Sequence, residues 1–128
     1  MLHHHEYAAT FFRAVDERDW ETWRLLVSPE ITIRFANQPP MGAESFQAMV
    51  DGGATLIPRV VHRIDAVWRD RWTAGDVVVV EMEVSYELAN GSSHVLPAIG
   101  VIRRRDGLAE DYRVVVDLSP VQASLGSG

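Results

Sequence analysis

The sequence predicts an α+β fold, with three N-terminal helices packed on a strongly curved, mostly antiparallel sheet that encloses a pocket. Three observations lead to this prediction: apolar residues recur at helical spacing before residue 53, alternation with period two follows from Val60, and glycine-containing turn dipeptides divide the second half. With 128 residues, the chain is long enough for one domain with its own core. We expect a single domain over 1–128, with a folded core at about 6–122.

The first half predicts helices around one strand. Ala8, Phe11, Phe12 and Val15 fall at i, i+3, i+4 and i+7, which is typical of one face of an amphipathic helix. Asp19 offers an N-cap for a second, short helix. The other elements are an alternating strand at 31–35, a loop at 37–42 and a third helix that carries Phe46, Met49 and Val50 and ends at Gly52-Gly53.

The second half predicts four strands in a meander. In the first strand, Val60, His62, Ile64, Ala66 and Trp68 share one face by strict alternation. Two dipeptides that tolerate positive φ indicate hairpins between the later strands. The expected strands are at about 60–68, 78–88, 93–105 and 109–118, with Asn90-Gly91 and Asp106-Gly107 at the hairpins and Pro120 after the last strand.

Composition excludes several classes of function. The chain has no cysteine, so a disulfide framework and a zinc–thiolate site are impossible. Its formal charge of -6 argues against nucleic acid or an anionic membrane as a partner. No apolar run reaches the roughly 18 residues of a membrane span, and the start lacks the apolar segment of a signal peptide. We expect a cytoplasmic protein, and we leave the His3–His5 run and the 125–128 tail out of the functional argument.

Four stretches resemble the NTF2-like superfamily, and within it the SnoaL-like group. They are "AVDERDWETW", "FANQPPMGAESF", "HRIDAVW" and "ELANGSSHVLPAIGVIRRRDGLAEDYRVVVDLSPV", and the resemblance covers residues 6–122. It implies the cone-shaped fold of that superfamily and a homodimer. It specifies the reaction poorly, because the scaffold hosts isomerases, epoxide hydrolases, aldol-type cyclases, dehydratases and non-enzymatic binders.

The residues of the known isomerase chemistry are missing. The positions that match the base and the oxyanion-hole residues of ketosteroid isomerases hold Arg34, Phe11 and Gly100. The resemblance therefore argues against that isomerase mechanism.

The limonene-type epoxide hydrolase triad is present only in part. Its Arg-x-Asp pair on the long strand is replaced by Val84 and Tyr86, whereas "YRVVVD" keeps Arg113 and the strand-end Asp117. SnoaL-like cyclases use an acid on a late strand and a pocket histidine, and Asp117 and His62 fit those places.

Asp117, His62 and Tyr86 are the candidate catalytic residues. Asp117 ends an apolar strand, and burial there would raise its pKa and make it a general acid or base; the alternative is a cap of the 117–120 turn. His62 lies on the apolar strand face, as either a proton shuttle or a satisfied core residue. Tyr86 shares that environment and can donate to a substrate oxygen or to a protein partner.

The residues expected to contact substrate form the pocket wall and its mouth. Arg113 can bind an anionic group, although pairing with Asp117 or Asp111 is the alternative. His94 is expected at the rim. The full set is Arg113, Asn37, Arg34, Trp68, Phe11 and His94.

These expectations point to an acid/base enzyme without cofactor or metal that acts on a hydrophobic small molecule by isomerisation, cyclisation, dehydration or hydrolysis. No closely spaced ligand pair supports a metal site. The alternative is a non-catalytic binding or dimerisation module. The two differ in whether polar groups converge in the pocket.

Overall fold

The computed structural model describes residues 3–126. Within that range the chain forms helices and strands in the predicted order, with one additional helix at the end. The elements are α1 (His4–Glu17), α2 (Trp20–Arg24), β1 (Val27–Phe35), α3 (Ala43–Gly53), β2 (Arg59–Trp72), β3 (Gly75–Glu87), β4 (Ser93–Arg105), β5 (Leu108–Val116) and α4 (Ser119–Gly126).

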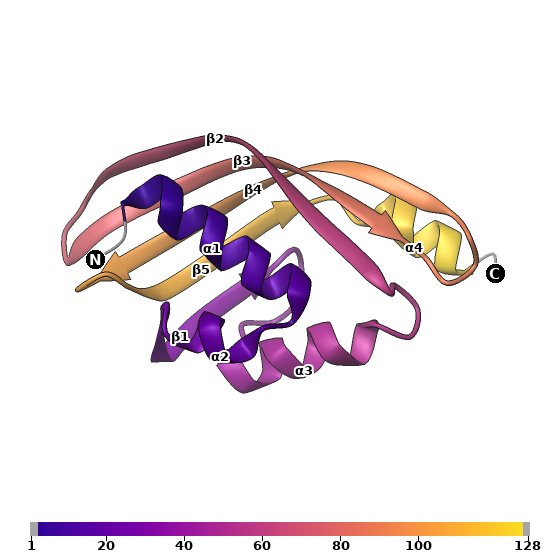
Figure 1. The fold of residues 1–128 in the computed structure, drawn as a ribbon, viewed down its shortest axis with the longest axis horizontal. Helices are drawn as coiled ribbons and strands as arrows, with labels where there is room; N and C mark the ends of the chain where they lie inside the picture. The colour runs from indigo at the N-terminus through magenta and orange to yellow at the C-terminus, as the bar shows by residue number, and fades with distance from the viewer. Residues whose placement is uncertain (1–2, 127–128) are drawn as a thin grey trace.

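In residues 3–126 the strands make one sheet in the order β1-β5-β4-β3-β2. The strands from β2 to β5 pair antiparallel in a meander, and β1 adds to β5 in parallel. Figure 1 shows the long strands arching over α1, with α2 and α3 near β1 and α4 at the end of the sheet where the chain ends. The α+β class and the curved, mostly antiparallel sheet are therefore confirmed.

The core lies between α1 and the concave face of the sheet. The predicted stripe of α1 is buried, and Phe11 packs edge-on against Tyr112 of β5 with ring centroids 4.9 Å apart. The even-numbered residues of β3 and β4 face the same core, as their alternation predicts. Asp19 caps α2 by accepting a hydrogen bond from the Thr22 N–H at 3.2 Å, as expected.

A β-bulge in β2 makes one part of the sequence interpretation wrong. Ile64 pairs with Met82, but Ala66 already pairs with the next residue, Glu81, so Asp65 is an extra residue in β2. An extra residue reverses the faces of everything that follows. Val67 is therefore buried, whereas Trp68, expected in the pocket wall, is 59% exposed on the convex face and donates from Nε1 to Glu81 at 2.6 Å.

The two hairpin dipeptides form different turns. Asp106 and Gly107 have φ of 53° and 81°, which suits the predicted two-residue turn between β4 and β5. At Asn90-Gly91 only Gly91 is in the left-handed region, at 91°. Gly91 N–H bonds to Leu88 O and Leu88 N–H to Ser92 O, so this connection is longer than the predicted two-residue loop.

Helix α4 differs from the prediction, in which Pro120 follows the end of the last strand. Proline is well tolerated in the first turn of a helix, where its missing N–H has no intrahelical partner. Val121 of α4 is buried, so the helix closes part of the fold. None of the helices in residues 3–126 is long and apolar enough to cross a membrane.

Candidate functional site

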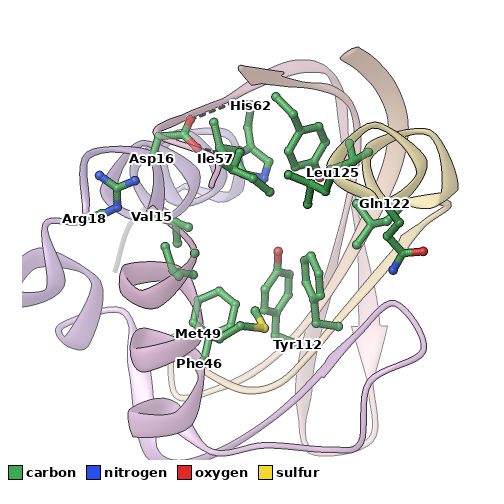
Figure 2. A pocket seen from close by; sticks show the side chains of 17 residues that line it. Val15, Asp16, Arg18, Phe46, Met49, Ile57, His62, Tyr112, Gln122 and Leu125 are labelled. Atoms are coloured by element: carbon green, nitrogen blue, oxygen red, sulfur yellow. Dashed lines mark hydrogen bonds and ion pairs between the residues drawn. The ribbon is translucent and has the colours of Figure 1, made fainter. Parts of the chain in front are cut away.

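An apolar pocket of about 280 Å³ lies between the helices and the sheet. Its walls come from the end of α1, from α3, from the neighbouring strands and from α4. Apolar side chains such as Phe46, Met49 and Leu125 supply most of the surface (Figure 2). The polar groups that reach it are few, as is usual for a small-molecule site.

Asp16 and His62 form a hydrogen-bonded pair in this wall. Asp16 Oδ1 lies 2.5 Å from His62 Nδ1, and Asp16 Oδ2 accepts the backbone N–H of His62 at 2.8 Å. Their side chains are only 14% and 12% exposed. Figure 2 shows the two side chains pointing toward each other at one side of the pocket.

The pairing specifies the tautomer of His62. A carboxylate only accepts hydrogen bonds, so Nδ1 carries the proton that it donates to Asp16. When the ring is neutral, its Nε2 is left with a lone pair. Among residues 3–126 no protein group is hydrogen-bonded to that nitrogen. The arrangement is that of a general base oriented by an acid.

The position of Asp16 is unfavourable for a carboxylate in two respects. It lies one residue before the end of α1, where the helix dipole disfavours negative charge, and it is largely removed from water. The two donors of His62 offset both costs. Since Asp16 is four residues after Phe12, it continues the buried stripe of α1.

Tyr86 and Tyr112 bring two phenols to the same pocket. Burial raises the pKa of Tyr86 to about 12, and the charge of Asp16 adds to the rise. Burial, followed by Tyr86 and Asp16, raises the pKa of Tyr112 well above its ordinary value. Within residues 3–126 neither phenol makes a hydrogen bond. Both stay protonated at neutral pH and are free to donate to a ligand.

The register of the sheet places these groups near the base. His62 of β2 lies opposite Val84 of β3, so Tyr86 is its diagonal neighbour on the concave face. Phe12 packs against the His62 ring at a centroid distance of 5.0 Å and against Tyr112 at 6.1 Å. Tyr112 points its hydroxyl into the cavity from the side opposite Asp16 and His62 (Figure 2).

Asp117 does not lie in this pocket, and the expectation of a buried carboxyl with a raised pKa is wrong. Asp117 is exposed and lines an adjoining groove beside β5, which shares Leu118 and Gln122 with the pocket. It accepts Ser119 Oγ–H at 2.5 Å and Ser119 N–H at 3.0 Å. These bonds, the side-chain one first, lower the pKa of Asp117. Asp117 therefore caps the 117–120 turn that leads into α4, as the alternative interpretation held.

The residues expected to contact substrate lie elsewhere too. Arg113 and Arg34 both pair with Asp111, at 3.0 and 2.8 Å. Arg113 is on the exposed face, because side chains of β5 alternate and Tyr112 occupies the inner position. Asn37 is exposed at the rim of the adjoining groove beside β5. Phe11 is completely buried in the core.

His94, expected at the rim, is outside the pocket lining. It lies opposite Tyr86 in the β3–β4 ladder, and its Nε2 is buried without a hydrogen-bond partner in residues 3–126. Of the predicted site, the structure thus brings His62 and Tyr86 together. It adds four polar residues that the sequence interpretation missed: Asp16, Arg18, Tyr112 and Gln122.

Sequence signals existed for some of these residues. Asp16 is an acid on the apolar stripe of a predicted helix, and such a residue is a candidate for a buried functional carboxylate. Tyr112 alternates with Val114 on an apolar strand face. Arg18 had no such signal. In residues 3–126 no cluster of His, Asp and Glu could hold a metal ion.

Comparison with solved structures shows the fold. A candidate SnoaL-like polyketide cyclase from Jannaschia sp. CCS1 superposes with a TM-score of 0.81 at 19% identity, over 98% of this chain and 92% of that one. An NTF2-like protein of unknown function from Burkholderia pseudomallei gives 0.83 at 17%, over 96% and 97%. An epoxide hydrolase from M. tuberculosis, of the limonene epoxide hydrolase-like type, gives 0.74 at 14%, over 96% and 89%.

Sequence comparison shows the family. No curated protein matches the sequence significantly. The family model described as the SnoaL-like domain matches residues 8–112, which hold the Asp16–His62 pair and both pocket phenols. This protein therefore belongs to the SnoaL-like domain family.

Proposed function

We propose that the protein is an acid/base enzyme in which His62, oriented by Asp16, moves a proton on a small, largely apolar carbonyl compound. The observation that carries the proposal is the 2.5 Å contact between Asp16 Oδ1 and His62 Nδ1 in the wall of an apolar pocket. It leaves Nε2 as a base in a site of low polarity. Proton transfer by such a positioned group contributes about 10²–10⁴ in rate.

The chemical step uses the groups at hand. His62 Nε2 takes a proton from the carbon beside the carbonyl, the C–H electron pair forms a C=C bond, and the carbonyl π pair moves to oxygen. Tyr86 or Tyr112 donates a hydrogen bond to that oxyanion. The imidazolium, stabilised by Asp16, then returns the proton to another carbon in an isomerisation, or to a departing hydroxyl that leaves as water in a dehydration.

The size of the pocket limits the substrate. Its volume of about 280 Å³ lies just below the usual range of ligand pockets, which is about 300–1,000 Å³. A molecule of one or two rings suits that volume better than a tetracycle. The mostly apolar wall provides binding by burial, and the phenols provide orientation.

Hydrogen–deuterium exchange at C1 of 2-tetralone tests the proton transfer without knowledge of the natural substrate. Proton NMR in D2O measures how much the protein accelerates exchange above buffer. We expect His62→Gln to lower the protein-dependent rate by about 10²–10⁴ and Asp16→Asn, which misorients the ring, by about 10². Asp117→Asn is the matched control outside the pocket and keeps the wild-type rate.

The histidine ring gives a second readout. Nitrogen-15 NMR of the wild-type protein should show His62 as the Nδ1–H tautomer, and Asp16→Asn should remove that preference. If the His62→Gln protein exchanges the C1 hydrogens of 2-tetralone at the wild-type rate, the proposal is refuted. Binding of 2-tetralone with no acceleration by the wild type would support the alternative, a pocket that binds small molecules without chemistry.

A further inference from the structure

The polar lining of the pocket includes a cation that the proton transfer does not use. Arg18 follows α1 directly and lies at the edge of the cavity on the same side as Asp16 (Figure 2). Its Nε is buried and has no hydrogen-bond partner among the described residues. The only side-chain hydrogen bond of Arg18 within residues 3–126 is a long one, from Nη2 to Pro58 O at 3.3 Å.

This arginine is an exception among the cations of the chain. All twelve basic residues are arginines, and the net charge of -6 means that carboxylates are abundant. Nine arginines in residues 3–126 contact a carboxylate, whereas Arg18 contacts none. The paired ones are Arg13, Arg34, Arg59, Arg63, Arg69, Arg103, Arg104, Arg105 and Arg113.

The other two unpaired arginines differ from Arg18 in their surroundings. Arg24 donates to Gln47 and lies over the Trp23 ring, and Arg71 is exposed near the end of β2. Neither lines the pocket. Arg18 is thus the one arginine that combines a pocket position with a buried, unused donor in the described part of the chain.

The backbone holds Arg18 in an uncommon conformation. Its φ is 53° and its ψ is 38°, in the left-handed region, and its N–H caps α1 through Ala14 O and Val15 O. Glycine is the usual residue there. Non-glycine residues in this region are uncommon, and the two others in residues 3–126, Ala36 and Asp106, lie in turns, so the conformation agrees with a functional side chain at Arg18 without requiring one.

We propose that Arg18 is a carboxylate-binding subsite, so that the ligand of this pocket is a small apolar carboxylic acid. Nε–H belongs to the edge with which a guanidinium takes a carboxylate through two parallel hydrogen bonds. The carboxylate sits at Arg18 and the apolar body fills the cavity. That the reacting carbon then lies at His62 Nε2 rests on the proposed function, whereas the subsite itself does not.

The net negative charge of the protein opposes the binding of a carboxylate ligand. Asp16 and the overall charge repel an anion, so a preference for a carboxylate needs a specific cation. The simpler interpretation is that Arg18 only caps α1 and contacts Pro58. In that case the pocket prefers the neutral member of any pair of ligands of the same shape.

Calorimetric titration with 2-naphthoate and 2-naphthamide, which have the same shape and differ in charge, separates the two interpretations. We expect the wild type to bind the naphthoate at least about 10-fold more tightly. Arg18→Met should abolish that preference with little change for the amide, and Arg18→Lys should keep part of it. Arg71→Met is the matched control and should keep the wild-type preference.

Equal binding of both ligands by the wild type, or a preference that survives in Arg18→Met, would overturn the subsite. Lack of measurable binding by naphthoate and by the smaller benzoate at millimolar concentration would overturn it too. Thermal unfolding verifies that Arg18→Met is folded. The 2-tetralone assay keeps the two proposals apart: a lost preference with intact exchange refutes only the subsite, and a kept preference with no exchange refutes only the chemistry.

Discussion

Removal of Asp76 tests whether the charges of the buried Asp76–Arg104 ion pair, which lies beside the N-terminal half of α1, stabilise the fold. Arg104 is 2% exposed, and it donates from Nε to Asp76 Oδ1 at 2.9 Å and from Nη2 to Asp76 Oδ2 at 2.5 Å. Arg69 donates to Oδ2 from the rim at 2.9 Å, and the Arg104 guanidinium lies 4.6 Å from the centre of the Tyr7 ring. Asp76→Ala leaves Arg104 charged, buried and without a carboxylate.

The expected loss in the free energy of unfolding is about 3–5 kcal/mol, because an unpaired buried charge keeps its desolvation cost. For a chain of this length that corresponds to a fall in Tm of about 10–20 °C. Urea unfolding followed by circular dichroism measures it, provided that the m-value stays constant. Glu17→Gln, which removes an ion pair whose side chains are both 62% exposed, is the control and should change stability by less than about 1 kcal/mol.

The pH dependence gives a second test of the same pair. The hydrogen bonds from Arg104, followed by Arg69, lower the pKa of Asp76 in the folded protein despite its burial. A lowered folded pKa gives stability that is present above the unfolded value of about 3.9 and is lost as the pH falls through the folded pKa. Asp76→Ala should remove that part of the acid sensitivity.

A double substitution would show whether the unpaired charge is the cause. Asp76→Leu with Arg104→Met removes both charges from the buried site, and Arg69, half exposed, can turn to water. We expect the double variant to be more stable than Asp76→Ala. A double variant as unstable as Asp76→Ala, or an Asp76→Ala protein within 1 kcal/mol of wild type, would refute the reasoning.

Three further predictions concern the pocket, a turn and the convex face. Tyr86→Phe should leave the free energy of unfolding within about 1 kcal/mol of wild type, since the phenol has no hydrogen-bond partner in residues 3–126. It should lower 2-tetralone exchange about 10-fold, and equal exchange rates would exclude Tyr86 from the reaction. Gly91→Ala should cost about 1 kcal/mol in urea unfolding because φ is 91° there. We expect a homodimer through the convex face, where the apolar side chains of Trp68 and Val115 are 59% and 63% exposed. Light scattering should give twice the monomer mass for the wild type and the monomer mass for Trp68→Glu. A monomeric wild type would contradict this expectation.

The sequence predicted the elements well because each one obeys a local rule. Period-two alternation in β3 and β4 and the helical stripe of α1 depend on neighbours in the chain. The errors occur where a local rule gave two answers. Pro120 can end a strand or begin a helix, and nothing between Val60 and Trp68 distinguishes a regular strand from one with a bulge at Asp65.

The site was less predictable, because its residues meet only in three dimensions. Asp16 and His62 are 46 residues apart, and the contact depends on how α1 lies across β2. His62 was found because it shares an apolar strand face. Asp16 was missed because the helical stripe was interpreted only as core. Asp117 was favoured by a resemblance in sequence, but the turn into α4 keeps it exposed.

Local consistency separates the two acids and favours Asp16 over Asp117 as the first one to test for a function. Asp117 satisfies every local requirement of its position: it is exposed, it caps the turn before α4, and its pKa is lowered by the O–H and N–H groups of Ser119 from which it accepts. Its presence is explained without any ligand.

Asp16 violates several requirements, since it is a carboxylate on an apolar stripe, near the negative end of a helix and largely removed from water. A sequence that places an unfavourable residue where an alanine or a leucine would continue the stripe loses stability there, and such conflicts concentrate at functional sites. The partner of Asp16 is a histidine whose free nitrogen has no other use within the described residues, which is why the dyad, rather than Asp117, is the group to test first.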